Sequence, residues 1–398
     1  MKHHIKFFPQ LILAIFALML SAHVFSQQGN ISDTVDNQSR KYFRHLMFRE
    51  TPYAEYRGIH PVEVDKNPNF AHYEFSLDSQ GRTTQIRYQI NDNLIRGNEV
   101  WDSFIWFAPV VKVSYSPGKE VHTYFNAKDQ QIEAHGSVYR AEYQLDGNGQ
   151  RRALSFFDMQ GDRSHSAWNI HRYEWRHEGE LVYEKRFDVN NQQQTMRPEL
   201  EFHEISLEYD ADDKLAFMRN LGLDGVPTNN KSGAGIDRVT YDLDGNFIRW
   251  QVYDKDGNAV EGNRPMVHLG EHLYDNYGNK VGLRGFDRSG KQVPFSWGVF
   301  EHASRYNKYG NQIESTLLKQ DGSAIRRLAF EYTAEQNKKT WLKSINANQQ
   351  LVSTPMLGGA AALKFTYNQE GDAQRQRFNP ELTEFVPPAA IQSSDNSE

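Results

Sequence analysis

The sequence contains no cysteine among its 398 residues. This absence excludes a disulfide framework, a thiol nucleophile and a lipid-bearing cysteine after an export signal. The basic residues are dispersed and the formal net charge is -6, which argues against nucleic acid as a partner. Hydrophobic residues reach only 38% while aromatic residues reach 13%, a proportion that suits many half-buried strands better than one thick core.

Long apolar runs are also scarce. Residues 1–26 combine a basic start, the apolar run 11–20 and a small-residue cleavage site, a pattern typical of a signal peptide cleaved after Ser26. That run is too short for a membrane-spanning helix, which needs about 20 apolar residues, and no later stretch of the sequence approaches that length. We therefore expect no transmembrane segment after cleavage, and a periplasmic or secreted protein.

A short motif recurs along the second half of the chain. It reads Tyr-Asp-Leu-Asp-Gly-Asn at residues 241–246, and related sequences follow at 274–279 and 306–311. Glycines of this series are 33 and 32 residues apart, and a second, interleaved series keeps the same intervals. The chain therefore contains a repeated unit of about 32 residues. We expect a structural turn at Gly245, Gly257, Gly278, Gly290, Gly310 and Gly322.

The Asp-x-Asp-Gly spelling also occurs in calcium-binding loops. Counted from Asp242, Gly stands at the fourth position and Tyr253 at the twelfth, whereas an EF-hand loop needs Gly at the sixth and a bidentate Glu at the twelfth. A turn explains each residue: the Asp side chain accepts a backbone N–H two residues on, and Gly supplies the positive φ that completes a hairpin loop with a bulge. We interpret the motif as a turn and predict no metal site and no cofactor.

The residues after each glycine predict strands. Ile248, Trp250 and Val252 alternate with polar residues, as in a half-buried strand. Each unit then consists of two β-hairpin turns joined by short strands, and single units must stack on their neighbours to be stable. The predicted fold is all-β, with tandem hairpins forming an elongated, twisted antiparallel sheet. The alternative is a closed β-propeller, whose usual repeat is longer, about 40 to 45 residues.

The signals at Tyr241, Tyr274 and, with Asn for Asp, Tyr306 resemble the YD-type repeats of the RHS family of bacterial exported and surface proteins. The resemblance covers residues 143–372 at most. RHS proteins use such repeats to build a large β shell around a toxin or to display carbohydrate- and protein-binding surfaces. This chain has a double unit, and it lacks both the length for a shell and an obvious toxin domain. The resemblance therefore implies an extracytoplasmic β-repeat scaffold.

Four segments are expected: a signal peptide (1–26), a polar linker and N-terminal cap (27–72), the hairpin repeat array (73–378) and a disordered tail (379–398). Within the cap, residues 40–50 could form a short amphipathic helix. The apolar run 104–107 reads as a buried strand, with a binding patch as the alternative.

Histidines offer one candidate metal site. His268 and His272 have the His-x-x-Glu-His spelling of inverted zincins, in which a helix places both imidazoles beside a catalytic Glu. Gly270 disfavours a helix, and on the strand expected here the two imidazoles would be about 13 Å apart, too far to share a zinc ion. A pair of strand histidines is therefore the preferred interpretation.

Aromatic residues provide the functional hypothesis. Tyr277 and Tyr309 occupy equivalent turn positions, and Trp168 and Trp175 lie near earlier turns. Exposed, regularly spaced rings suit stacking on sugars or anchoring a protein, although they could instead pack on neighbouring hairpins. We expect an exported, non-enzymatic repeat scaffold that binds a cell-envelope polysaccharide or protein partner. The alternative is a glycan-active hydrolase with carboxylates assembled across repeats.

Overall fold

The computed structural model describes residues 39–67, 69–90, 93–94, 108–198, 200–333, 338–368 and 373–386. They belong to one compact unit, Gln38–Glu398. The expected signal peptide, the apolar run 104–107 and residues 387–398 of the expected tail lie outside the described ranges.

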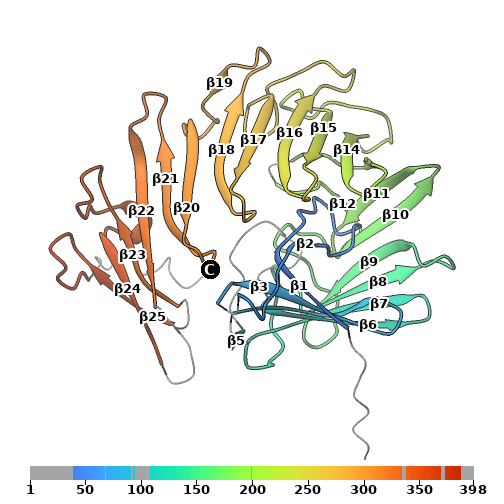
Figure 1. Ribbon diagram of the computed structural model, residues 1–398. Coiled ribbons are helices and arrows are strands. Elements are labelled where there is room, and N and C mark those ends of the chain that lie inside the picture. The colour runs from blue at the N-terminus through green and yellow to red at the C-terminus, as the bar shows by residue number, and fades with distance from the viewer. Residues whose placement is uncertain are drawn as a thin grey trace, which may run out of the picture. The chain divides into compact units, whose positions relative to one another are not determined.

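The described residues form 25 strands and one short 3-10 turn (Figure 1). The first thirteen strands are β1 (Ser39–Leu46), β2 (Gly58–Pro61), β3 (His72–Leu77), β4 (Thr83–Ile90), β5 (Asn93–Leu94), β6 (Val110–Ser116), β7 (Lys119–Phe125), β8 (Arg140–Leu145), β9 (Arg151–Phe157), β10 (Arg172–Glu178), β11 (Leu181–Phe187), β12 (Gln193–Gln194) and β13 (Ile205–Tyr209). The others are β14 (Leu215–Asn220), β15 (Ile236–Tyr241), β16 (Phe247–Tyr253), β17 (Leu269–Tyr274), β18 (Lys280–Phe286), β19 (Gln292–Val293), β20 (Glu301–Tyr306), β21 (Gln312–Leu318), β22 (Ala324–Tyr332), β23 (Lys339–Ser344), η1 (Pro355–Leu357), β24 (Ala362–Tyr367) and β25 (Ala373–Phe378).

All described strands join one antiparallel sheet. Its hydrogen-bonded order is β2-β1-β3-β4-β6-β7-β8-β9-β10-β11-β13-β14-β15-β16-β17-β18-β20-β21-β22-β23-β24-β25. The two-residue strands β5, β12 and β19 pair with β4, β11 and β18, respectively. Within the described residues β2 and β25 do not pair, so the sheet is open and not divided into propeller blades. The prediction of an all-β sheet of antiparallel hairpin repeats is confirmed. In these same ranges no helix is long and apolar enough to cross a membrane.

The repeated motif forms hairpin turns. In the turn at 275–279, Asp275 Oδ1 accepts the backbone N–H groups of Tyr277 and Asn279, both at 2.9 Å, and Gly278 has a φ of 75°. The ladder shifts register between Leu273 and Tyr274, as a bulged hairpin requires. The Asp oxygen that a calcium loop would offer to an ion is therefore engaged by the backbone. Positive φ values from 75° to 93° occur at Gly245, Gly257, Gly278, Gly290, Gly310 and Gly322.

Several units contain a third turn that the sequence analysis missed, whereas β21 and β22 are joined by a second turn alone. After strand β16 and the second turn at 254–258, the chain turns again at 262–267 before β17 begins. Equivalent third turns lie at 166–170, 230–234 and 295–299, each closed by a backbone hydrogen bond of 2.7 to 2.9 Å between its first and fifth residues. The expected unit of two turns is therefore one turn short where a third turn is present, and it is correct for the unit with β20, β21 and β22. Because first turns join strands at one edge of the sheet, the second and third turns share the other edge, called here the third-turn edge.

The helix expected at residues 40–50 is wrong. Residues up to Leu46 form β1, which pairs with β2 on one side and with β3 on the other. Phe43 packs edge-on against Phe75 of β3, with ring centroids 5.4 Å apart. Pairing on both sides satisfies the backbone of this segment and overrides its helical periodicity.

An N-terminal loop, residues 47–57, links β1 to β2 and packs on strands far along the sheet. Phe48 stacks on Phe247 of β16 at 4.6 Å between ring centroids. Arg151 of β9 donates hydrogen bonds to three consecutive loop carbonyls, those of residues 52, 53 and 54, at 2.9 to 3.1 Å. Since one short loop reaches both β9 and β16, the sheet bends around it, and the buried apolar cluster of these strands forms against the loop.

The opposite face of the sheet carries cross-strand ion pairs. Arg249 of β16 faces Glu271 of β17, and Arg284 of β18 lies 3.1 Å from Glu301 of β20. Such solvent-exposed pairs contribute about 0 to 1 kcal/mol each. The stability of the fold therefore depends chiefly on the inner face and the N-terminal loop.

The turn glycines differ in what a side chain would meet, which gives a matched test. A Cβ on Gly245 would lie 2.7 Å from Cγ2 of the buried Ile59, whereas Gly257, with nearly the same φ, has nothing within 4 Å. Gly257→Ala is expected to cost about 1 to 2 kcal/mol from the left-handed backbone alone. Gly245→Ala should cost clearly more, because Ile59 and the β2 segment must also move. Urea unfolding of both variants measures the difference; equal losses would show that the contact with β2 carries no weight.

Candidate functional site

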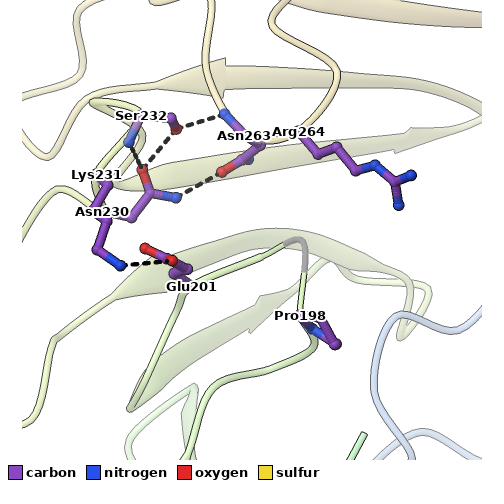
Figure 2. A pocket seen from close by; sticks show the side chains of 7 residues that line it. All are labelled: Pro198, Glu201, Asn230, Lys231, Ser232, Asn263 and Arg264. Carbon is purple, nitrogen blue, oxygen red and sulfur yellow. Dashed lines mark hydrogen bonds and ion pairs between the residues drawn. The ribbon is translucent and has the colours of Figure 1, made fainter. Parts of the chain in front are cut away.

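A pocket of about 460 Å³ lies on the third-turn edge (Figure 2). It is open to solvent, and three loops line it: the connection between β12 and β13, and the third turns at 230–234 and 262–267. Its volume falls in the range of about 300 to 1,000 Å³ that ligand sites usually have. The described residues lining it are Pro198, Glu201, Asn230, Lys231, Ser232, Asn263 and Arg264.

The floor of the pocket is a network of amide and hydroxyl groups (Figure 2). Asn230 Oδ1 accepts the backbone N–H of Ser232 at 2.9 Å and the Ser232 hydroxyl at 2.7 Å, which fixes its turn. Asn230 Nδ2 then donates to Asn263 Oδ1 at 2.9 Å, and the Asn263 backbone N–H donates to Ser232 Oγ at 2.6 Å. Two successive third turns are thereby held side by side, and the floor is rigid before any ligand arrives.

A buried carboxyl group supports this floor from below. Asp237 of β15 accepts a hydrogen bond from Asn263 Nδ2 at 2.9 Å. Burial, together with the charge of Glu50 in the N-terminal loop, raises the pKa of Asp237 to about 7, while Arg197 and the Asn263 hydrogen bond act in the opposite direction. Glu50 itself pairs with Arg197 at 2.5 Å. Asn263 thus connects the pocket floor to a charged cluster that includes the N-terminal loop.

The groups that face a ligand are charged. Lys231 Nζ lies 3.0 Å from Glu201 Oε1, and the Lys231 side chain is 89% exposed. Arg264 is exposed, and its side chain extends away from the Asn230 and Asn263 network (Figure 2). Lys231 retains N–H groups for a second acceptor, and Glu201 retains lone pairs for a donor. The site can therefore bind a polar ligand with both kinds of group.

An exposed tryptophan belongs to the next third turn along this edge. Ser296 donates its backbone N–H to the Pro265 carbonyl at 3.0 Å and its hydroxyl to the Arg264 carbonyl at 2.6 Å. The neighbouring Trp297 is 50% exposed and stacks on the buried Phe295, with ring centroids 4.8 Å apart and planes 5° from parallel. Trp297 therefore presents a fixed, flat ring beside the rim of the pocket.

The four aromatic residues proposed from the sequence do not gather in one place. Tyr277 is 53% exposed and Tyr309 is half-buried, and both lie at first turns, on the edge opposite the pocket. Trp168 is half-buried at a third turn and packs edge-on against His135, with ring centroids 4.7 Å apart. Trp175 is buried on β10 and donates its indole N–H to Glu184 at 2.8 Å, so it is not available to a ligand.

The histidine motif lies on the sheet and not on a helix. His272 is on β17 and His268 immediately precedes that strand. Their Nδ1 atoms lie within hydrogen-bonding distance of backbone carbonyls, 2.8 Å for His268 to Val252 and 3.0 Å for His272 to Phe247. Among the residues that the structure describes, no three His, Asp or Glu side chains converge as a metal site would require.

Comparison with known proteins leaves the family open. No protein-family model matches the chain, and no curated protein matches it. Among solved structures, a TcdB2-TccC3-Cdc42 crystal structure matches 85% of the chain with 9% identity and a TM-score of 0.21, and the match covers 21% of that longer chain. A porin-like protein from Bacteroides vulgatus matches 75% of the chain, and 94% of its own, with 7% identity and a TM-score of 0.19. Values this low identify neither the family nor the function.

Proposed function

We propose that this protein is an exported, non-enzymatic repeat scaffold that binds a cell-envelope polysaccharide or protein partner along its third-turn edge. The observation that carries the proposal is the pocket of about 460 Å³, with a preorganised floor and charged groups at its rim. Export rests on the amino-terminal signal, and recovery of the protein outside the cytoplasm with Gln27 as its first residue would support it.

The arrangement of the edge favours an extended ligand. Equivalent positions in neighbouring units are separated by two strands, which corresponds to roughly 10 Å along the sheet. The floor spans two units through the Asn230 and Asn263 hydrogen bond, and Trp297 belongs to a third. A polymer or a protein surface can contact all three units at once, whereas a small molecule would occupy only the pocket.

Binding is favoured over the alternative of glycan hydrolysis. Glycoside hydrolysis generally uses two carboxyl groups about 5 to 10 Å apart on either side of the scissile bond. Among the described residues lining the pocket, Glu201 is the one carboxylate, and Asp237 lies behind Asn263. The pocket as described thus has groups for recognition and lacks a facing acid and base.

Charge reversal at the pocket tests the site. The purified chain is expected to bind a component of a panel of envelope polysaccharides and envelope proteins, and Lys231→Glu should weaken that binding about 10-fold or more, because a repelling charge replaces a donor. Lys308→Glu, at an exposed first turn on the opposite edge of the sheet, is the matched control and should leave affinity unchanged. Isothermal titration calorimetry measures both.

Two outcomes would contradict a binding site at the third-turn edge. If Tyr277→Ala combined with Tyr309→Ala abolishes binding while Lys231→Glu has no effect, the ligand binds at the first-turn edge. If the wild-type chain retains no polysaccharide or protein of the panel, the scaffold has no binding role of this kind.

A further inference from the structure

We propose that Arg264, Met266 and Trp297, called here the display cluster, form the docking surface for a folded protein partner that offers an apolar hollow with an adjacent carboxylate. The inference deepens the proposed function and rests on it, because it selects a protein over a polysaccharide. The three side chains lie in two successive third turns, at 262–267 and 295–299. Hydrogen bonds from Ser296 to the carbonyls of Arg264 and Pro265 hold these turns together.

Met266 occupies a backbone position that does not suit it. Its φ is 53°, in the left-handed region that residues other than Gly, Asn and Asp rarely adopt. The corresponding residues of the sister turns are Asn169, Gly233 and Gly298, residue types that tolerate positive φ. The turn itself therefore gives no reason for methionine at this position.

The exposure of its apolar side chain is a second unfavourable feature of Met266. Met266 is 49% exposed, and Trp297, one turn along, is 50% exposed. Met266 follows Pro265 in the chain, and Trp297 follows Ser296. Because Ser296 donates a hydrogen bond to Pro265, the two apolar side chains lie at adjacent points of the third-turn edge. Backbone strain that the packing of the turn does not explain indicates a functional role. Contiguous exposed apolar groups mark interaction sites.

The chemistry of the cluster fits a protein better than a sugar polymer. Methionine, tryptophan and arginine are enriched at protein interfaces, and a thioether adapts its shape to an irregular apolar hollow. Sugar recognition would use the flat Trp297 ring but gains little from an unbranched, flexible thioether beside it. Arg264 is exposed in the same turn as Met266, and its positive charge favours a partner that carries a carboxylate.

The backbone of the third turns also limits how a partner can bind. The first residue of the 295–299 turn donates its N–H to the Val299 carbonyl at 2.9 Å, and the Gly298 N–H donates to the Phe295 carbonyl at 2.8 Å. Because these N–H groups are hydrogen-bonded within the turn, the contact with a partner must be made by side chains. Strand addition to this edge is not expected, so the partner presents a formed surface and not an extended peptide.

The Met266→Asn variant distinguishes a role of Met266 in partner binding from a role in stability, and the partner need not be known for this test. Asparagine tolerates positive φ, occupies the matching position as Asn169, and is polar. The variant is expected to unfold at the same temperature as the wild-type chain or at a higher one, because strain and apolar exposure are both relieved. A lower unfolding temperature would overturn the proposal, because it would make Met266 part of the stabilising packing.

The binding arm uses the full exported chain in intact cells, with a benzophenone amino acid in place of Pro294, the exposed residue before the 295–299 turn, as the cross-linking probe. The cross-linked protein is identified, purified and titrated against the wild-type chain. Met266→Asn and Trp297→Ala are each expected to weaken this direct binding about 10-fold or more. Leu243→Asn is the matched control, because Leu243 is fully exposed at a first turn on the other edge, and it should leave the affinity unchanged.

Several results would overturn the proposal. They are the absence of any cross-linked protein, equal binding by Met266→Asn and the wild-type chain, or weakening by Leu243→Asn to the same extent. If a polysaccharide binds in a manner that depends on Lys231 and Trp297 but not on Met266, this inference fails while the proposed scaffold function stands. If no polysaccharide and no protein binds, the proposed function fails first.

Discussion

Replacing Glu184 with alanine is expected to destabilise the protein by about 3 to 5 kcal/mol, the cost of leaving one partner of a buried ion pair uncompensated. Glu184 and Arg186 lie two residues apart on β11, on the same face of the sheet, and both side chains are fully buried. Arg186 Nη1 donates to Glu184 Oε1 at 2.7 Å. Without the carboxylate, the guanidinium would remain in the core with its hydrogen bonds to carbonyl groups and without the carboxylate that it contacts directly.

Glu184 also joins other parts of the fold. Its Oε2 accepts the indole N–H of Trp175 from β10 at 2.8 Å, and the hydroxyl of Thr51 in the N-terminal loop donates a further hydrogen bond to it. Burial raises the pKa of Glu184, and the charge of Arg186 opposes this shift, so the pair depends on both members. The alanine variant loses a charge partner and two hydrogen bonds together.

A double-mutant cycle in urea unfolding measures the coupling. Glu184→Ala with Arg186→Met should be more stable than the sum of the single effects implies, because no unpaired charge remains. The control is Glu301→Ala, which removes one member of the half-exposed pair with Arg284 and should cost no more than about 1 kcal/mol. Similar losses for Glu184→Ala and Glu301→Ala would contradict the assignment of stability to the inner face.

The repeat could be predicted from the sequence because its information is local. A first turn needs an Asp or Asn whose side chain accepts two backbone N–H groups and a Gly with positive φ, and these residues recur at fixed intervals, as at Asp275 and Gly278. The third turn has no such fixed composition. It begins with Asn230 in one unit and Phe295 in another, and its constant features are a positive φ at the last residue but one and a buried apolar last residue, such as Ala234 or Val299.

The candidate site was missed for a related reason. Its lining comes from loops that are separated by about 30 residues each and meet only through the pairing of strands, so no single stretch of sequence resembles a site. One signal was present: Lys231 and Arg264 each follow the asparagine of successive third turns, Asn230 and Asn263, and stand 33 residues apart. Trp168 and Trp297 likewise share the third position of their turns. Both regularities become visible once the third turn is recognised.

The error at β1 and the burial of Trp175 have a common origin in the N-terminal loop. A helical periodicity at residues 40–50 is a local property, whereas the strand forms because β2 and β3 flank it. Trp175 was a candidate ligand-binding residue near a turn, yet it lies on the sheet face that the loop covers, and Tyr53 of that loop packs against its ring at 5.5 Å between centroids. No local pattern indicates that residues 47–57 cross the strands of several units.

Asp237→Asn is expected to stabilise the protein at neutral and alkaline pH. Burial, together with the nearby charge of Glu50, raises the pKa of Asp237 from 3.8 to about 7 in the folded state. The folded chain therefore keeps a proton that the unfolded chain has lost. The stability supplied by this proton is fully present below the unfolded pKa, near 4, and is lost as the pH rises towards 7.

The size of the effect follows from the shift. Between pH 4 and 7 the free energy of unfolding should fall by up to 1.36 kcal/mol per pH unit on account of this group, roughly 3 to 4 kcal/mol in all. Asparagine keeps an oxygen to accept the Asn263 hydrogen bond and carries no charge, so the variant should lack this slope. Its advantage over the wild-type chain is expected to be largest at pH 8 and to vanish near pH 4.

Urea unfolding of both proteins at pH 4.5, 6 and 8 measures the slope directly. The matched control is Asp254→Asn at an exposed second turn, where hydrogen bonds from the Asn258 side chain and backbone lower the pKa of the aspartate. That variant should gain stability at no pH, because its carboxylate is favoured in the folded state. If Asp237→Asn shows no advantage at pH 8, Asp237 is ionised at little cost in the folded protein, and the cluster of Glu50, Arg197 and Asn263 then accommodates a second negative charge beneath the pocket floor.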